Sequence, residues 1–232
     1  MLKKIKLKLF NISPCNFLFL NSTLFMDMIQ NHKISTKKIS KKNLDVFICE
    51  KIDFTELEIP LFENELIHLQ NLKSHTRKIE FLGVRHLRNL LRKDLEIFYS
   101  ELGKPYTAIP NQYISISHSK NFIGLALSSY HVGIDIEECS YRVLKVANKF
   151  LNPSEKNLIN THSIEEVTSA WCIKECLFKL NDRNGIDFKE ELIIQSMDGL
   201  QAKAKMLGID QWDNVNLGIE KFGDLILCYN FE

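Results

Sequence analysis

Two short segments set the strongest limits on how this chain of 232 residues can fold. In the first, Val132–Glu137, apolar and acidic residues alternate. A strand points successive side chains to opposite faces, so Asp135 and Glu137 should share one face and the isoleucines of the segment the other. The segment therefore predicts a strand that carries a carboxylate pair on one side.

The second segment, Ala170–Leu180, has the periodicity of a helix. Its aliphatic stripe repeats at three- and four-residue steps: Ala170, Ile173, Leu177 and Leu180. Trp171, Glu175 and Lys179 follow at four-residue steps and should lie on neighbouring turns. If this helix packs beside the strand, three carboxylates and two lysines surround one small space. Such a space suits a hard divalent cation that holds a phosphate.

Each segment alone is ordinary, because an acidic strand face is often only solvated and W-x-x-K-E is common helix composition. Together they resemble the two signature motifs of the 4′-phosphopantetheinyl transferases, G-[IV]-D-x-E and W-x-x-K-E-[AS]-x-x-K. Cys176 stands where that family usually has alanine or serine. The chain is more similar to the longer, two-lobed Sfp-like subgroup than to the short carrier-protein synthases.

Three upstream segments resemble further motifs of the same family, in the same order. Arg77–Arg85 is similar to its basic helix, Gly103–Tyr106 to its G-K-P turn, and Ile114–Ser119 to its strand that ends in S-H-S. Ser115 replaces the more common asparagine of that strand. The resemblance covers residues 44–200, and five segments in register are far more specific than one.

The resemblance implies an α+β fold of two similar lobes with pseudo-two-fold symmetry, each a small, mostly antiparallel sheet packed with helices. We expect an N-terminal extension at residues 1–27, an N-terminal lobe at 28–130 and a C-terminal lobe at 131–232 that carries the metal site. No linker rich in glycine, serine or proline separates the lobes, so they should share a broad interface.

The N-terminal residues fit two interpretations. Residues 1–8 are basic and residues 9–25 are apolar, as in a signal peptide. Asn11, Pro14 and Asn21 interrupt the apolar run, however, and no small-x-small cleavage site follows. The run is also too short and too broken to span a bilayer. We expect an upstream extension, untranslated or disordered, rather than a signal.

Periodicity and turn residues predict the order of the elements. Residues 29–43 are polar and rich in lysine, and should be a loop or a poorly ordered lead-in. Helices are predicted at residues 62–72, 77–91, 143–150, 153–159 and 164–181. Strands are predicted at residues 45–52, 113–116, 122–128, 132–136, 192–196, 202–206, 215–219 and 225–229.

Composition limits the setting. Hydrophobic residues make up 45% of the chain, enough for a sizeable core, and the formal net charge of +1 gives no general attraction to nucleic acid. The six cysteines show no C-x-x-C pair, so a zinc site or a disulfide framework is not expected. We therefore expect a cytoplasmic protein that binds neither membrane nor nucleic acid. The resemblance implies a monomer.

The family reaction moves phosphopantetheine from coenzyme A to a serine of a carrier protein and releases adenosine 3′,5′-bisphosphate. The resemblance implies that Asp135, Glu137 and Glu175 bind Mg²⁺, which would neutralise charge on the pyrophosphate. Glu175 is the first candidate for the base that takes the serine proton, directly or through water. Asp135 and Lys179 complete the predicted catalytic set.

Coenzyme A carries several phosphates, and the chain has no glycine-rich phosphate loop, so cationic side chains must hold it. Residue by residue, the resemblance implies these contacts: Lys174 and Lys179 to the phosphates, Lys104 and Pro105 beside the adenine, Ser117 and His118 at the 3′-phosphate, and Arg77 or Lys78 from the early helix. Which of the last two points inward stays open.

Other functions and contacts stay open at this point. The carrier could dock on Tyr141–Phe150, or that segment could be an ordinary amphipathic helix. A relative of the same fold could bind coenzyme A or a nucleotide without catalysis, although the presence of all three acidic residues argues against this. A small hydrolase that uses the same metal site on another diphosphate is a third possibility.

Overall fold

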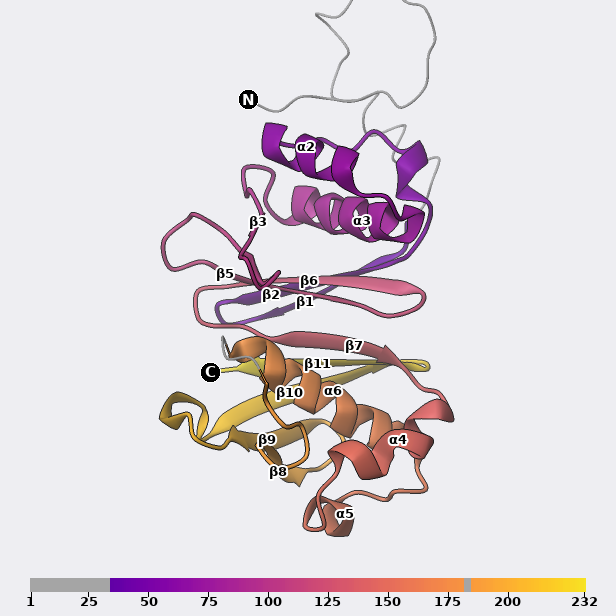
Figure 1. Ribbon diagram of the computed structural model, residues 1–232, viewed down its shortest axis with the longest axis vertical. Coiled ribbons are helices and arrows are strands. Elements are labelled where there is room, and N and C mark those ends of the chain that lie inside the picture. The colour runs from indigo at the N-terminus through magenta and orange to yellow at the C-terminus, as the bar shows by residue number, and fades with distance from the viewer. Residues whose placement is uncertain (1–33, 182–184) are drawn as a thin grey trace, which may run out of the picture.

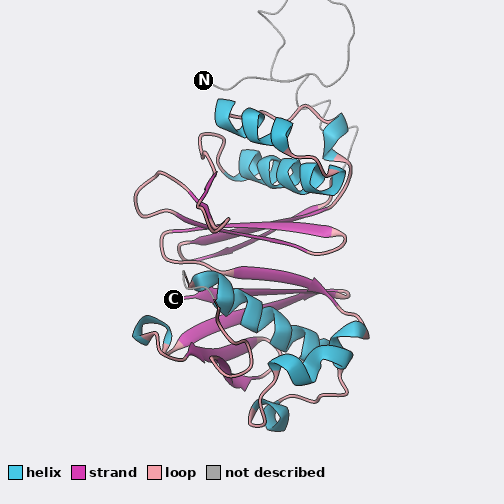
Figure 2. Ribbon diagram, in the orientation of Figure 1, coloured by secondary structure: helices cyan, strands magenta, loops and turns pink. Residues whose placement is uncertain are grey.

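The computed structural model describes residues 34–181 and 185–232. The predicted extension at residues 1–27 lies outside them. The described chain stacks in layers, with helices outside and two antiparallel sheets facing each other between them (Figure 1, Figure 2).

The first sheet has four strands in the order β1-β2-β6-β5. They are β1 (Thr36–Lys41), β2 (Leu44–Glu50), β6 (Phe122–Ser128) and β5 (Tyr113–His118). Helix α3 (His75–Leu91) packs on the outer face, and α2 (Glu63–Asn71) lies over α3 (Figure 1). A short ribbon of β3 (Phe98–Tyr99) and β4 (Pro105–Tyr106) stands beside β5, and a 3₁₀ turn, η1 (Phe54–Glu56), precedes α2.

The second sheet has five strands in the order β7-β11-β10-β9-β8. They are β7 (Ile134–Glu138), β11 (Leu225–Phe231), β10 (Val215–Phe222), β9 (Gln201–Met206) and β8 (Leu192–Met197). Helix α6 (Ile164–Leu180) packs against this sheet, with α4 (Arg142–Phe150) beside α6 and α5 (Glu155–Leu158) beside β8. A second 3₁₀ turn, η2 (Asp210–Trp212), joins β9 to β10.

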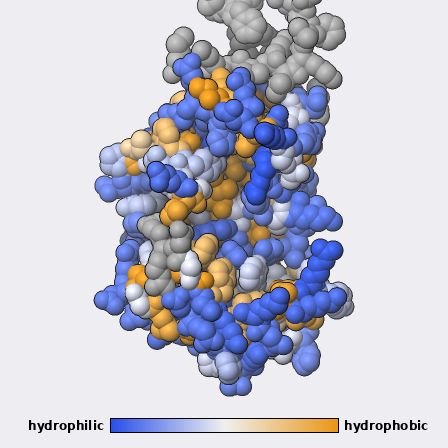
Figure 3. All heavy atoms as spheres, viewed as in Figure 1, coloured by the Kyte–Doolittle hydropathy of each residue, from blue (hydrophilic) through white to orange (hydrophobic). Residues whose placement is uncertain are grey.

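Three hydrophobic cores hold the layers together. One lies between α3 and the first sheet, and one between α6 and the second sheet. The third lies between the sheets and joins β2 and β6 to β7 and β11. Strand β11 shows the reason: Leu225 and Leu227 belong to the core between the sheets, whereas Ile226 and Cys228 face α6. On the face shown in Figure 3, hydrophilic residues predominate, with smaller hydrophobic areas among them.

The structure confirms the predicted α+β class with antiparallel sheets and packed helices. The predicted helices and strands are present with small shifts at their ends. The prediction of a loop or poorly ordered lead-in at residues 29–43 is wrong for residues 36–41, because Thr36–Lys41 forms edge strand β1 in register with β2. Its polar residues match an edge strand with one exposed side, which composition alone does not separate from a loop. Residues 29–33 lie outside the described residues. The pseudo-two-fold symmetry and the lobe boundary at residue 130 remain predictions.

Candidate functional site

Asp135 occupies the centre of the candidate site, on β7 beneath α6. Asp135 is 4% exposed. Oδ1 accepts hydrogen bonds from Ser117 Oγ at 2.8 Å and from Lys179 Nζ at 2.8 Å. Oδ2 is buried and has no hydrogen-bond partner. A carboxylate oxygen left in this condition is costly, so a cation at that oxygen would be stabilising.

Two further carboxyl groups lie near Asp135, as the alternation of β7 and the four-residue steps of α6 predicted. Trp171 Nε1 on α6 donates to Glu137 Oε1 at 3.2 Å. Burial, followed by repulsion from Asp135, raises the pKa of Glu137 to about 7, and the same two causes raise that of Glu175 to about 7. The site is therefore short of positive charge, although Lys179 contributes one ammonium group.

These residues fit a hard divalent cation by the chemistry of their oxygens and by the orphaned Oδ2 of Asp135. Within residues 34–181 and 185–232, no group of three or more His, Cys, Asp or Glu side chains is already arranged to hold a metal ion. Lys179 lies against Asp135 and also donates to Ile134 O at 2.9 Å. Burial lowers the pKa of Lys179, but Asp135 more than offsets this and the pKa lies above its usual value.

Lys174 does not reach this acidic cluster. Its side chain is fully buried on another side of α6, where Nζ donates to Glu155 Oε2 at 2.8 Å and to Phe188 O at 2.8 Å. The predicted contact of Lys174 with phosphates does not agree with this position. The sequence placed Lys174 beside Glu175, but adjacent helix residues point about 100° apart.

Serine hydroxyls join the edges of the two sheets. Ser115 Oγ on β5 accepts from Ile134 N at 3.0 Å, and Ser117 Oγ accepts from Ile136 N at 3.2 Å. Ser117 is 4% exposed and contacts Asp135 directly, so its place here is beside the acidic cluster. The role of Ser115 was missed, although the alternation of serines in I-S-I-S was a visible signal that both lie on one face.

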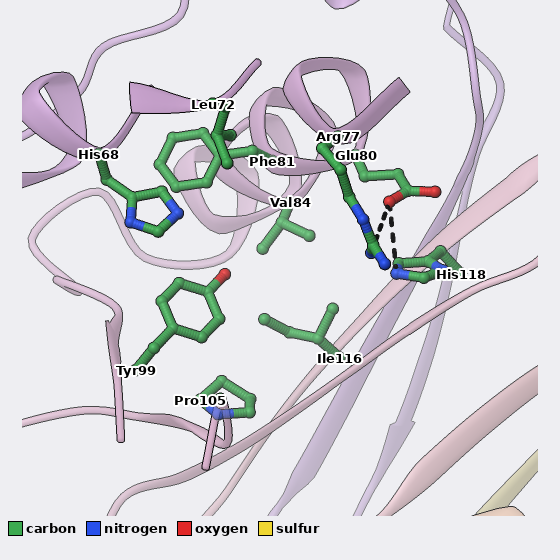
Figure 4. Close-up of a pocket in the computed structure, with 11 residues that line it drawn as sticks. His68, Leu72, Arg77, Glu80, Phe81, Val84, Tyr99, Pro105, Ile116 and His118 are labelled. Atoms are coloured by element: carbon green, nitrogen blue, oxygen red, sulfur yellow. Dashed lines mark hydrogen bonds and ion pairs between the residues drawn. The ribbon is translucent and has the colours of Figure 1, made fainter. Parts of the chain in front are cut away.

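A cavity of about 290 Å³ opens between α3, the β3–β4 ribbon and the end of β5 (Figure 4). Phe81, Tyr99 and Pro105 contribute to its apolar part. Arg77 and His118 lie at its charged end. Lys78, the alternative to Arg77, is not among the residues that line this cavity. The cavity thus combines a flat, apolar wall with two cationic or ionisable groups, which suits a nucleoside phosphate.

Glu80 joins the groups at the charged end of this cavity. It accepts from Lys51 Nζ and Arg77 Nη1, each at 3.1 Å, and lies 3.5 Å from His118 Nε2. Burial raises the pKa of Glu80, but Lys51, His118 and Arg77 more than offset this and the pKa lies below its usual value. Burial lowers the pKa of His118. Lys51 could not be linked to this cavity from the sequence, because it follows β2 and lies far along the chain from α3.

A second cavity has a volume of about 550 Å³. Lys104, which precedes β4, and Lys179 of α6 both line this cavity. Lys104 Nζ donates to Asn181 O at 3.3 Å. Pro105 lines both cavities. The structure therefore brings Lys104, Pro105 and Lys179 to one place, as expected for residues that serve one ligand.

Comparisons with known proteins bear on this geometry. Residues 131–224 match the model of the 4′-phosphopantetheinyl transferase superfamily. This segment includes β7, α6 and all three carboxylates. The resemblance inferred from the motifs is thus confirmed over residues 131–224, the segment that carries the acidic cluster.

Curated relatives carry the same description. A 4′-phosphopantetheinyl transferase of Bacillus subtilis is 33% identical over 84 residues, which are 34% of this chain and 38% of that protein. The transferase gsp of Aneurinibacillus migulanus is 30% identical over 105 residues, 44% of this chain and 41% of that protein. Sfp of Bacillus subtilis (strain 168) is 29% identical over 93 residues, 38% of this chain and 42% of Sfp. Each match spans less than half of the relative.

No helix within the described part of the chain is long and apolar enough to cross a bilayer.

Proposed function

We propose that this chain transfers the 4′-phosphopantetheine group of coenzyme A to a serine of an apo carrier protein, with Mg²⁺ as cofactor. The observation that carries the proposal is the cluster of the buried Asp135 with the partly buried Glu137 and Glu175. Lys179 contacts Asp135 in this cluster and, with Lys104, lines the adjoining cavity. The family of residues 131–224 supports the same reaction.

In this proposal Asp135, Glu137 and Glu175 hold Mg²⁺, whose charge would neutralise the pyrophosphate. The serine oxygen of the carrier attacks the β-phosphorus, and the bond from that phosphorus to the bridging oxygen breaks. Adenosine 3′,5′-bisphosphate leaves with the bridging oxygen. Glu175 takes the serine proton, directly or through water.

Side chains around the two cavities would hold coenzyme A. Arg77 and His118 suit a phosphate at the charged end of the smaller cavity, because a guanidinium presents several donors in one plane. Lys104 and Pro105 would border the adenine, and Lys179 would face the pyrophosphate. Ser117 acts by holding Asp135, and its buried position leaves it no direct place in a phosphate site. Lys174 has no place in this set.

The carrier would approach from the side of α4. Tyr141, at the start of this helix, is 76% exposed and Val146 is 38% exposed, and both lie among basic side chains. Those side chains are Arg142, Lys145 and Lys149. A carrier protein that is acidic around its serine would complement such a surface. We place the reaction in the cytoplasm, a reducing compartment, and none of the five described cysteines forms a disulfide. We also expect a monomer.

The direct test is incubation with coenzyme A, Mg²⁺ and an apo carrier, followed by the intact mass of the carrier. The wild-type chain should add one phosphopantetheine, and Glu175→Gln should slow the transfer by roughly 10²- to 10⁴-fold while the protein stays folded. Two carriers, one from fatty-acid synthesis and one from peptide or polyketide synthesis, would define the partner.

Three results would contradict the proposal in different ways. Binding of coenzyme A without any gain of carrier mass would indicate a binding module of the same fold. Release of adenosine 3′,5′-bisphosphate without a carrier would indicate a hydrolase. Equal rates with and without a chelator of divalent cations would remove the metal from the mechanism.

A further inference from the structure

A buried ion pair between α6 and α5 lies outside the acidic cluster. Lys174 and Glu155 are each fully buried, and their charged atoms lie 2.8 Å apart. Glu155 also accepts from Asn152 N at 2.9 Å and from Ile194 N at 2.8 Å. The pair therefore joins α6 to α5 and β8 at one point.

The second hydrogen bond of Lys174 connects it, through Phe188, to a residue that contacts the site. Its ammonium donates to the carbonyl of Phe188, in the loop between α6 and β8, and so fixes the backbone at Phe188. The ring of Phe188 stacks on Trp171, with centroids 5.5 Å apart and planes inclined by 23°. Phe150 contacts Trp171 edge-on, with the ring centroids 5.1 Å apart. Trp171 is thus held between two aromatic rings.

Trp171 reaches the acidic cluster through its indole N–H, which donates to Glu137. The contacts form one continuous path: Glu155, Lys174, Phe188, Trp171 and Glu137. Each step is a hydrogen bond, an ion pair or a ring stack, and only the last two residues adjoin the site. Residues that orient a metal-binding carboxylate through hydrogen bonds commonly change metal affinity when they are mutated.

We propose that the Lys174–Glu155 ion pair is a positioning device: it fixes Phe188, which holds Trp171 at the angle that orients the carboxylate of Glu137. This inference rests on the proposed function, in which Glu137 binds Mg²⁺. It gives Lys174 a role at the site that needs no contact with coenzyme A. It also explains why a lysine next to Glu175 is buried in the protein interior.

Fluorescence of Trp171 tests the path without any transfer reaction. The chain has two tryptophans, so Trp212→Phe leaves Trp171 as the only one. In that background, Lys174→Met and Phe188→Leu should each raise acrylamide quenching of Trp171 by about twofold, because the indole is less well fixed. Each should also raise the Mg²⁺ concentration that half-saturates the change in Trp171 fluorescence, by roughly 10-fold or more.

Trp171→Phe separates positioning from packing, because phenylalanine keeps the ring contacts and removes the N–H donor. In the transfer assay this variant should need about 10-fold more Mg²⁺ for half-maximal rate, with a smaller change in kcat at saturating Mg²⁺. If Lys174→Met does not fold, Phe188→Leu and Trp171→Phe still decide the question.

Val215→Ala is the matched control, since it trims a side chain of the same core in β10. It should lower the melting temperature without changing Trp171 quenching or the Mg²⁺ requirement. The proposal is wrong if Phe188→Leu behaves like this control, or if Trp171→Phe leaves the Mg²⁺ requirement unchanged. A chain without transfer activity would overturn the proposed function, whereas the quenching measurement would still decide the positioning.

Discussion

At the scale of single residues, the candidate site consists of carboxyl groups whose burial and mutual repulsion are unfavourable in the absence of a bound cation. Asp135 has one oxygen with two donors and one with none. Glu137 and Glu175 lie near it with pKa values of about 7, against an ordinary value of 4.5. Protons can relieve this repulsion in the absence of a metal, so the stability of the chain should depend on pH.

The sign of this dependence follows from the raised pKa values. Between about pH 4.5 and 7 the folded chain retains protons on Glu137 and Glu175 that the unfolded chain has released. The free energy of unfolding should therefore decrease as the pH rises through this window and level off above it. Urea unfolding of the wild type minus that of the double variant Glu137→Gln, Glu175→Gln measures the effect.

Saturating Mg²⁺ should flatten the same difference, because the bound cation replaces the protons. A difference curve that is flat without Mg²⁺, or one that rises with pH, would contradict the assignment of raised pKa values to these two carboxyl groups.

Ser117→Ala should destabilise the chain by about 1–3 kcal/mol, because the buried N–H of Ile136 and Oδ1 of Asp135 each lose a partner. Ser115→Ala is the matched control, since its hydroxyl makes the same kind of bond to Ile134 N and none to Asp135. Both should lower stability in denaturant unfolding. The Mg²⁺ requirement of the transfer should change for Ser117→Ala, and an equal change for both variants would argue against a link to Asp135.

At the scale of elements, the distance between β7 and α6 decides whether the carboxylates can share a site. Gly133, just before β7, allows the close approach, because a Cβ there would lie 2.3 Å from Cys176 O. Cys176 Sγ, in turn, donates to Gly133 O at 3.0 Å. The small residues at both positions bring Lys179 within reach of Asp135.

Gly133→Ala should therefore push α6 away from β7 and cost about 1–3 kcal/mol of stability. Gly124→Ala on β6 is the matched control, because its added Cβ would meet nothing closer than 3.4 Å, and its effect should stay within about 1 kcal/mol. Thermal unfolding and transfer activity measure both variants. Full activity of Gly133→Ala would mean that the helix can shift without affecting the site.

At the scale of the whole molecule, the two sheets share a core, so neither half buries its apolar surface alone. Leu44 and Ala126 from the first sheet and Ile136 and Leu227 from the second belong to this core. The second cavity draws residues from both halves. A site built in this way keeps its shape only while the sheets stay packed.

The chain should therefore unfold in a single transition, with the calorimetric and van't Hoff enthalpies equal. Leu227→Ala, at a fully buried position between the sheets, should cost about 2–5 kcal/mol and lower that single transition. Hydrogen exchange followed in β2 and β10 should accelerate together. Two separate transitions, or faster exchange in only one sheet, would show that the halves unfold independently.

Much of the fold was predictable from local pattern. The alternation at Val132–Glu137 predicted the two faces of β7, and the aliphatic stripe predicted the buried side of α6. Edge strand β1 was missed because its polar residues are equally typical of a loop. The acidic cluster was predictable because strand and helix periodicity fix which side chains share a face.

The sequence by itself determined which residue types could meet: alternate carboxylates on a strand, and Trp171, Glu175 and Lys179 on one side of a helix. Only the tertiary structure decided which of the neighbouring lysines serves the site. Lys174 and Lys179 look alike in the sequence, yet one is buried against Glu155 and the other lies against Asp135. Glu155, the partner of Lys174, and Ser117, the partner of Asp135, come from distant parts of the chain, so only packing brings them into contact. An ionised side chain can be buried only where a counter-charge or a hydrogen-bond donor is in place.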